Sequence, residues 1–203
     1  HPKDISEELI YLFNDEPGLC RHMHLPVQSG SDAVLKRMGR GYTKKDYISK
    51  VSLLKKLYPD MSITTDIIVG FPGETEGDFK DTMDLISEVG FDNIFSFTYS
   101  PRSGTPAAGF TGQVPLEVKS ERLKALHETQ GGITAEKNRA FVGKRVEVLV
   151  EGESKSLREE ASGRTSCNRI VKFPAPKRLA GTLADVIVTD AFSNSLRGVE
   201  APR

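Results

Sequence analysis

The spacing of apolar residues switches between helical and strand periods several times within the first hundred positions. Apolar side chains recur at helical spacing after Asp4, Thr43 and Thr75, which are residue types that cap helices. Between these segments, short apolar runs predict three strands, at residues 20–28, 63–69 and 93–100. Helix and strand therefore alternate, and this order predicts parallel strands joined by crossover helices.

A different pattern begins after residue 100. Turn residues fill Pro101–Pro106 and Gly109–Pro115, and a helix is predicted from about Leu116 to Arg139, with a kink or interruption at Gly131-Gly132. Short alternating segments separated by Gly, Pro or Ser then follow, at residues 145–150, 169–173, 183–188 and 191–197. Several strands without helices indicate a small β-barrel. We expect three parts: an α/β part over residues 1–112, a linker and connecting helix over 113–139, and a β-barrel over 140–203.

The composition is that of a globular protein, with 37% hydrophobic and 28% charged residues. No apolar run approaches the ~18 residues that span a bilayer, and no signal peptide opens the chain. We therefore expect a cytoplasmic protein without a membrane partner. The formal net charge is zero. Residues 161–184, however, hold five basic residues and no acidic one, and a local basic run of this kind favours contact with nucleic acid.

Two cysteines, Cys20 and Cys167, lie far apart in the sequence and form neither a metal motif nor a disulfide framework. Reduced thiols are the expectation for both. His22 and His24 alternate on the first predicted strand, and such a pair could bind a metal. Without further ligands, we expect core or rim histidines and no metal site.

Polar residues stand at the ends of the predicted strands. In repeated βα architecture, the groups that contact a ligand lie where strands end and loops begin. Gln28, Arg40 and Asp66 occupy such positions. Asp66 also lies within an apolar run, where a carboxylate is costly unless it is hydrogen-bonded, so we expect a partner or a ligand for it. Gly70–Gly73 is typical of a strand-to-helix turn and is not a phosphate loop, because no Gly-Lys-Ser/Thr follows.

Taken together, several segments resemble the second half of a radical S-adenosylmethionine (SAM) domain, and the methylthiotransferase family is the closest match. The segments are Leu25–Ser31, Val34–Arg40, Asp66–Thr75, Phe97–Ser100 and Arg102–Pro106. The resemblance implies a partial (half) β/α radical SAM barrel over residues 1–112. It further implies that residues 140–203 form a TRAM domain, a small OB-like β-barrel that binds RNA.

The resemblance also implies roles for single residues. Gln28, with Ser29 beside it, is expected to contact the ribose or methionyl part of SAM. Arg40 is expected to meet the SAM carboxylate, a pairing that suits the guanidinium fork. Asp66 is expected to accept from a ribose hydroxyl or the amino group, and the backbone around Phe97 and Tyr99 is expected to line the adenine.

The basic run supplies the expected RNA contacts, which are Arg164, Arg169, Lys172, Lys177 and Arg178. Basic side chains on a small barrel can bind phosphates. The alternative is that these charges are simply solvated on the surface. Phe173, on the strand among them, is expected to be core rather than a stacking platform. The segments Gly163–Phe173 and Asn194–Gly198 are most similar to the enzymes that methylthiolate isopentenyladenosine beside the tRNA anticodon, so the anticodon arm is the expected partner.

Family members use a [4Fe-4S] cluster to cleave SAM and a second cluster for sulfur delivery. The first cluster needs three cysteines at CxxxCxxC spacing, which this chain lacks. We therefore expect a C-terminal fragment that is inactive alone. The exposed edges of a half barrel should lead either to self-association or to a tightened and partly covered half barrel. Two alternatives stay open. The parent enzyme could act on a ribosomal protein or on threonylcarbamoyladenosine in tRNA, or the chain could be a non-enzymatic RNA-binding module.

Overall fold

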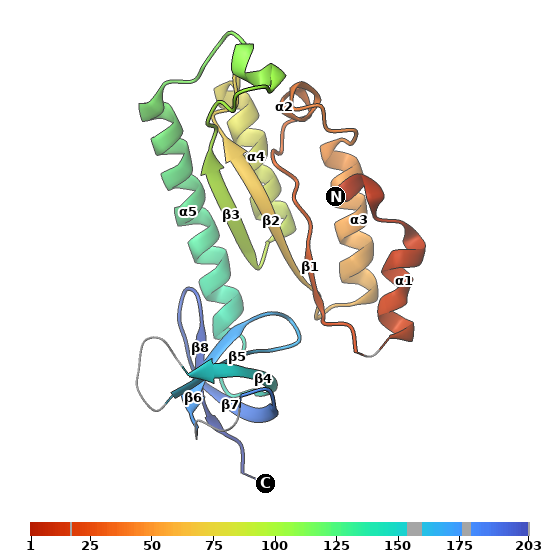
Figure 1. Ribbon diagram of the computed structural model, residues 1–203, viewed down its shortest axis with the longest axis vertical. Helices are drawn as coiled ribbons and strands as arrows, with labels where there is room; N and C mark the ends of the chain where they lie inside the picture. Colours follow the sequence, from red (N-terminus) through yellow and green to blue (C-terminus); the bar gives the residue numbers. More distant parts are fainter. Residues whose placement is uncertain (17, 154–159, 176–179, 203) are drawn as a thin grey trace. The chain divides into compact units, whose positions relative to one another are not determined.

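The structure, a computed structural model, describes residues 1–16, 18–153, 160–175 and 180–202. The chain packs as two units, each with its own apolar core (Figure 1). One unit comprises residues 1–12 and 23–133, and the other comprises residues 13–22 and 134–203.

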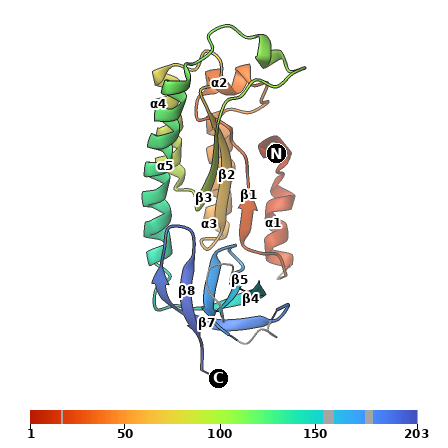
Figure 2. The same cartoon turned by 60° about the vertical axis from the view of Figure 1, so that its left-hand side comes forward.

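A three-stranded sheet in the order β1-β2-β3 forms the centre of the first unit (Figures 1 and 2). Its strands are β1 (His22–His24), β2 (Ser62–Val69) and β3 (Asn93–Thr98). β2 and β3 are parallel, in a register that pairs Asp66 with Phe95 and Ile68 with Phe97. The predicted parallel α/β arrangement is thus confirmed.

The first strand is shorter than predicted. After His24 the ladder stops, and pairing resumes only as an isolated parallel bridge between Gln28 and Ile67. Two residues account for the break: Pro26 has no N–H to donate, and Gln28 adopts a left-handed backbone with φ 73°. The chain therefore turns at Gln28, where β2 is near its carboxyl end.

The helices of the first unit alternate with the strands. They are α1 (Glu7–Asp15), α2 (Asp32–Arg37), α3 (Lys44–Leu57) and α4 (Glu76–Val89), with 3-10 turns η1 (Pro2–Asp4) and η2 (Pro106–Gly109). Thr43 and Thr75 each form a capping box with the residue three positions on, as their spacing predicts. The first helix departs from prediction, because its first turn is capped by the Ser6 hydroxyl, which accepts from Leu9 N at 3.2 Å, and not by Asp4.

Alternation along β2 divides the sheet into a core face and an open face. Ile63, Ile67 and Val69 are buried on the face that α3 and α4 cover (Figures 1 and 2). Asp66 and Ile68 point to the opposite face and are only partly buried. Asp66 is thereby presented on the open face of the sheet, in the carboxyl-terminal half of β2.

A single continuous helix, α5 (Leu116–Arg139), follows the loop after β3. The predicted interruption at Gly131-Gly132 is wrong. Neighbouring side chains explain why the helix continues: His127 Nε2 lies 2.7 Å from Ser96 Oγ, and Gln130 Nε2 donates to Phe91 O at 2.9 Å. Tertiary contacts of this kind override the weak helix propensity of two glycines.

The second unit contains a closed five-stranded barrel in the order β4-β5-β6-β8-β7. Its strands are β4 (Arg145–Glu153), β5 (Glu160–Arg164), β6 (Ile170–Pro174), β7 (Leu183–Ala191) and β8 (Leu196–Glu200). Phe173 is fully buried in the barrel core, as predicted, among Val148, Val171, Val186 and Leu196. The predicted partial β/α barrel followed by a small OB-like β-barrel is confirmed.

One barrel strand, β5, has no strand signal in the sequence, because its residues are mostly small or charged. Gly163 in β5 and Gly198 in β8 face the interior, where an added Cβ would lie 2.3 Å from Leu149 O and 2.4 Å from Ile187 O, respectively. Glycine therefore lets neighbouring backbones approach within a barrel this small. Among the described residues, no helix has the length and apolar character needed to cross a bilayer.

Candidate functional site

A cavity of about 750 Å³ opens at the carboxyl ends of β2 and β3. Its volume is in the range of sites that enclose a small organic ligand. Five of the residues that the sequence singled out line it, namely Gln28, Arg40, Asp66, Phe97 and Tyr99. The remaining lining residues include Arg37, Ile68, Phe71, Arg102 and Phe110.

Gln28 is placed by backbone bonds to β2. Its N–H donates to Asp66 O, and its carbonyl accepts from Ile68 N, both at 2.9 Å. The residue is 7% exposed. Its left-handed backbone ends the pairing with β2 and turns the chain toward α2. The structure therefore brings Gln28 and Asp66 together at one strand end.

Ser29 lies outside the group that lines the cavity. Its hydroxyl is buried 3.3 Å from Thr82 Oγ1, and the next residue, Gly30, donates its N–H to the same oxygen at 2.9 Å. Ser29 therefore joins the loop after β1 to α4. The expected contact of Ser29 with SAM is not supported by this placement.

Arg40 and Tyr99, which both line the cavity, each contain a polar atom that the described residues leave unsatisfied. Arg40 Nε and Tyr99 Oη are buried, and neither has a hydrogen-bond partner among the residues that the structure describes. A buried polar atom without a hydrogen-bond partner is costly, so each of these atoms is a candidate for a hydrogen bond to a ligand. Arg40 also faces the Tyr42 phenol, whose pKa is raised by burial and is pulled back in part by the Arg40 charge.

Asp66 has a partner from the neighbouring strand. His24 Nε2 lies 3.3 Å from Asp66 Oδ1, and His24 Nδ1 lies 3.0 Å from Thr64 Oγ1. The ring of His24 meets Phe95 edge-on, with 5.7 Å between centroids. The expectation that a carboxylate in this strand needs a partner is met, and His24 is a rim histidine. The side chain of Asp66 remains 29% exposed and can accept from a ligand as well.

Aromatic rings form one wall of the cavity. Phe97 is 56% exposed and lies beside Ile68 across the β2–β3 pair. Phe71 contacts Tyr99 and Phe110 edge-on, at centroid distances of 5.1 and 6.2 Å. An aromatic wall beside polar strand ends suits a nucleoside, which has an aromatic base and a hydroxyl-bearing ribose.

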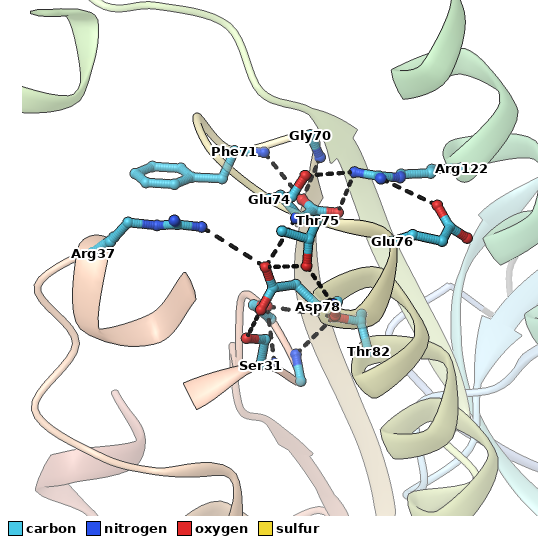
Figure 3. A network of polar contacts seen from close by, with 12 residues as sticks. Ser31, Arg37, Gly70, Phe71, Glu74, Thr75, Glu76, Asp78, Thr82 and Arg122 are labelled. Carbon is cyan, nitrogen blue, oxygen red and sulfur yellow. Dashed lines mark hydrogen bonds and ion pairs between the residues drawn. The ribbon is translucent and has the colours of Figure 1, made fainter. Parts of the chain in front are cut away.

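A buried carboxylate holds the loop that leads from β2 to α4 (Figure 3). Glu74 Oε2 accepts from Gly70 N at 2.6 Å and from Phe71 N at 3.1 Å, and its Oε1 lies 3.2 Å from Arg122 Nη1. Burial raises the pKa of Glu74, and Arg122 and the two N–H groups counteract part of this effect. Because Phe71 lines the cavity, Glu74 fixes one of its walls.

A second carboxylate ties the same loop to the start of α2 (Figure 3). Asp78 accepts hydrogen bonds from Ser31 Oγ and from the hydroxyl and N–H of Thr75, and Arg37 Nη2 lies 4.0 Å away. Burial alone would raise the pKa of Asp78, but the hydrogen bonds and Arg37 outweigh it and hold the pKa below its ordinary value. The two strand-end loops are thus fixed to each other.

The predicted RNA-contacting residues in the described part of the barrel are Arg164, Arg169 and Lys172. Arg164 is exposed and bonds Glu151 Oε1 at 3.1 Å and Asn168 Oδ1 at 2.9 Å. Arg169 is partly buried: it donates to Asn138 Oδ1, and its guanidinium lies 4.7 Å from the Phe141 ring centroid. Arg169 therefore has a structural role in addition to any contact with RNA. Lys177 and Arg178 lie outside the described residues.

The parallel pair β6–β8 contributes a basic residue that the sequence analysis did not select. Arg197 lies beside Lys172 in the register of this pair and forms an ion pair with Glu160 at 2.6 Å. Because β6 and β8 are distant in sequence, only the closed barrel brings these two cations together. Arg37, Arg102 and Phe110 were likewise not selected as site residues, although Arg37 and Arg102 lie in motif segments.

Comparison with known proteins bears directly on this arrangement. Residues 2–86 match the model of the Radical SAM superfamily, and residues 139–199 match that of the TRAM domain. The chain therefore contains part of a radical SAM domain. A TRAM domain follows the radical SAM region, as the resemblance in the sequence implies.

Relatives that match this chain share about half of its residues. The tRNA-2-methylthio-N(6)-dimethylallyladenosine synthase of Syntrophus aciditrophicus (strain SB) is 52% identical over 198 residues, which cover 98% of this chain and 43% of that protein. The protein of the same name from Legionella pneumophila (strain Corby) is 50% identical, over 98% of this chain and 44% of its own length. The chain thus spans less than half the length of these relatives.

Radical SAM proteins combine SAM with an iron–sulfur cluster, and the residues present fit the two groups differently. The cavity offers SAM a guanidinium, a carboxylate, an amide and aromatic rings. Cys20 is exposed, Cys167 is partly buried, and no cluster of three metal-ligating side chains occurs among the described residues. These two cysteines do not fit an iron–sulfur cluster, which needs three or four thiolates.

Proposed function

We propose that this chain supplies part of the SAM pocket and the tRNA-binding domain of a radical SAM methylthiotransferase. The substrate position would be C2 of N6-isopentenyladenosine beside the anticodon, and the enzyme would act in the cytoplasm. The observation that carries the proposal is the convergence of Gln28, Arg40 and Asp66 on one cavity. Two of its lining residues, Arg40 and Tyr99, also have a buried polar atom without a partner among the described residues.

Four of the lining residues would hold different parts of SAM. Arg40 would bind the methionyl carboxylate, a charge-assisted contact that satisfies its buried Nε. Asp66 would accept from the ribose hydroxyls or the amino group, and Phe97 and Tyr99 would line the adenine. Bound SAM would supply the radical chemistry, while these groups hold its sulfonium end in register. The cluster ligands are not in this chain, so it would be inactive alone.

The TRAM barrel would bind the anticodon arm. Arg164 and Lys172 point outward from neighbouring strands, and phosphate contacts from such a surface are typical of RNA-binding barrels. The names of the relatives favour a prenylated adenosine over a ribosomal protein or a threonylcarbamoylated adenosine.

Equilibrium dialysis with labelled SAM tests the cofactor part of this proposal. We expect weak but saturable binding that drops about tenfold or more in Arg40→Gln and in Asp66→Asn, because each loses a charge-assisted hydrogen bond. Lys80→Gln is the matched control, since Lys80 is an exposed cation on α4 that does not line the cavity. Equal SAM affinity in all four proteins would contradict the proposal.

Fluorescence anisotropy with anticodon stem-loops tests the substrate part. A stem-loop that carries N6-isopentenyladenosine should bind more tightly than the same RNA with unmodified adenosine. Tighter binding of a threonylcarbamoylated stem-loop would instead assign the chain to the sister activity.

A further inference from the structure

The charges that line the cavity do not balance with SAM alone. Arg37, Arg40, Arg102 and Asp66 are its charged lining residues within the described chain. Arg37 is offset by Asp78, at 4.0 Å. Arg40, Arg102 and Asp66 then leave the lining with one surplus positive charge.

SAM adds to this surplus. Its carboxylate and ammonium cancel, and its sulfonium leaves the molecule with one positive charge. If Arg40 meets the carboxylate and Asp66 meets the ammonium or ribose, no group of SAM remains for Arg102. Two unneutralised cations would then share a partly enclosed site, which is unfavourable. An anionic second occupant removes this imbalance.

Arg102 itself is free to bind such an anion. It lies in the loop between β3 and α5, where its carbonyl accepts from the N–H of Thr105 at 3.2 Å and from the Thr105 hydroxyl at 2.7 Å. These bonds fix the backbone beneath the side chain. The guanidinium is exposed, and it makes no hydrogen bond or ion pair with any residue in the described part of the chain. A fixed backbone with an unpaired guanidinium at a cavity is suited to a phosphate.

We propose that Arg102 binds a backbone phosphate of the RNA substrate next to the target adenosine. The inference rests on the proposed function, because it assumes that RNA reaches this cavity. It adds an RNA contact in the radical SAM region that is separate from the TRAM barrel. The contact would position the target nucleotide at the mouth of the cavity while Arg40 and Asp66 hold SAM inside.

The test measures binding of an isopentenyladenosine anticodon stem-loop to the full chain over a series of KCl concentrations. Each phosphate contact adds about 0.7 to the slope of log Kd against log salt for single-stranded RNA. Arg102→Gln should therefore lower this slope by about 0.7 and weaken binding about fivefold near 0.1 M KCl. Arg102→Lys should keep the slope, and Lys80→Gln should behave as the unsubstituted chain. SAM affinity of Arg102→Gln should be unchanged.

The outcomes separate this inference from the proposed function. An unchanged salt slope of RNA binding in Arg102→Gln overturns the inference. A loss of SAM affinity with normal RNA binding also overturns it, because this result would assign Arg102 to the SAM carboxylate. RNA binding without salt dependence in the unsubstituted chain also overturns it. The chain could instead fail to bind SAM while the salt slope of its RNA binding still depends on Arg102. This result would contradict the proposed cofactor role but would support the phosphate contact.

Discussion

Arg122 and Glu74 form an ion pair that is almost fully buried, with Nη1 and Oε1 3.2 Å apart and side-chain exposures of 8% and 4%. Arg122 lies on α5, and Glu74 lies in the loop between β2 and α4. The pair therefore links the last helix of the first unit to the loop that carries Phe71 into the cavity.

Breaking this pair should be strongly destabilising. Arg122→Met or Glu74→Gln each removes one partner of a buried ion pair, at a cost of up to about 3–5 kcal/mol. The loss is reduced because Arg122 keeps Glu76 Oε2 at 3.2 Å and Glu74 keeps the N–H groups of Gly70 and Phe71. The double variant should lose less than the sum of the two, with a coupling energy of about 1–3 kcal/mol. Urea denaturation followed by far-UV circular dichroism measures this. Lys80→Ala, which breaks an exposed pair with Asp84, is the control and should leave the midpoint unchanged. Strictly additive losses would contradict the coupling.

Two glycines should respond oppositely to alanine. At Gly30 an added Cβ would lie 2.4 Å from Asp81 O and 2.5 Å from Thr82 Cα, both backbone atoms of α4, so Gly30→Ala should destabilise the chain and shift the loop after β1. At Gly131, inside α5, an added Cβ meets nothing within 4 Å. Gly131→Ala should therefore stabilise by about 0.5–1 kcal/mol. Thermal denaturation compares the two, and a stabilising Gly30→Ala would show that the close approach to α4 is incorrect.

The lowered pKa of Asp78 should make the first unit sensitive to acid. Because the folded pKa lies below the unfolded value, the unfolded state binds more protons between the two values. The stability from ionised Asp78 is thus present above about pH 4 and is lost as the pH falls below it. Asp78→Asn should be less stable than the unsubstituted chain at pH 6 and should show a shallower decline between about pH 4 and 3. Urea midpoints across this range test it, and parallel pH profiles would contradict it.

Tyr99→Phe should separate ligand binding from folding. The Tyr99 hydroxyl has no hydrogen-bond partner among the described residues, so its removal costs the fold nothing. The same change should weaken SAM binding about tenfold if the hydroxyl pairs with the ligand. Equilibrium dialysis measures the SAM affinity, and denaturation of the same preparation measures the unfolding midpoint. A lower unfolding midpoint with unaltered SAM affinity would point to a purely structural hydroxyl.

The small number of cysteines and the exposed strand edges lead to two last expectations. Chemical reconstitution with iron and sulfide should yield no stoichiometric iron–sulfur absorbance, because two dispersed cysteines cannot hold a cluster. Light scattering over a range of concentrations should show self-association, since β1 and β3 are edges of the three-stranded sheet. A stoichiometric cluster, or a monomer throughout, would contradict the respective statement.

Sequence reasoning worked where the cause is local. Thr43 and Thr75 were predicted as caps because a capping box involves only four successive residues. Phe173 was predicted as core because alternation along one strand fixes which side chains share a face. Prediction failed where a distant partner decides the outcome, as at Gly131-Gly132, where contacts with β3 and Phe91 accompany a continuous helix.

The order of helices and strands in the first unit, the caps at Thr43 and Thr75 and the polar residues at the strand ends were determined by the sequence itself, because each depends on spacing within a few residues. The cavity and the Glu74–Arg122 pair were decided only by the tertiary structure. The same holds for the lack of partners, among the described residues, for the Arg102 guanidinium and the Tyr99 hydroxyl. They depend on which side chains from distant segments come within hydrogen-bonding range. A local sequence pattern does not predict the distance between such segments.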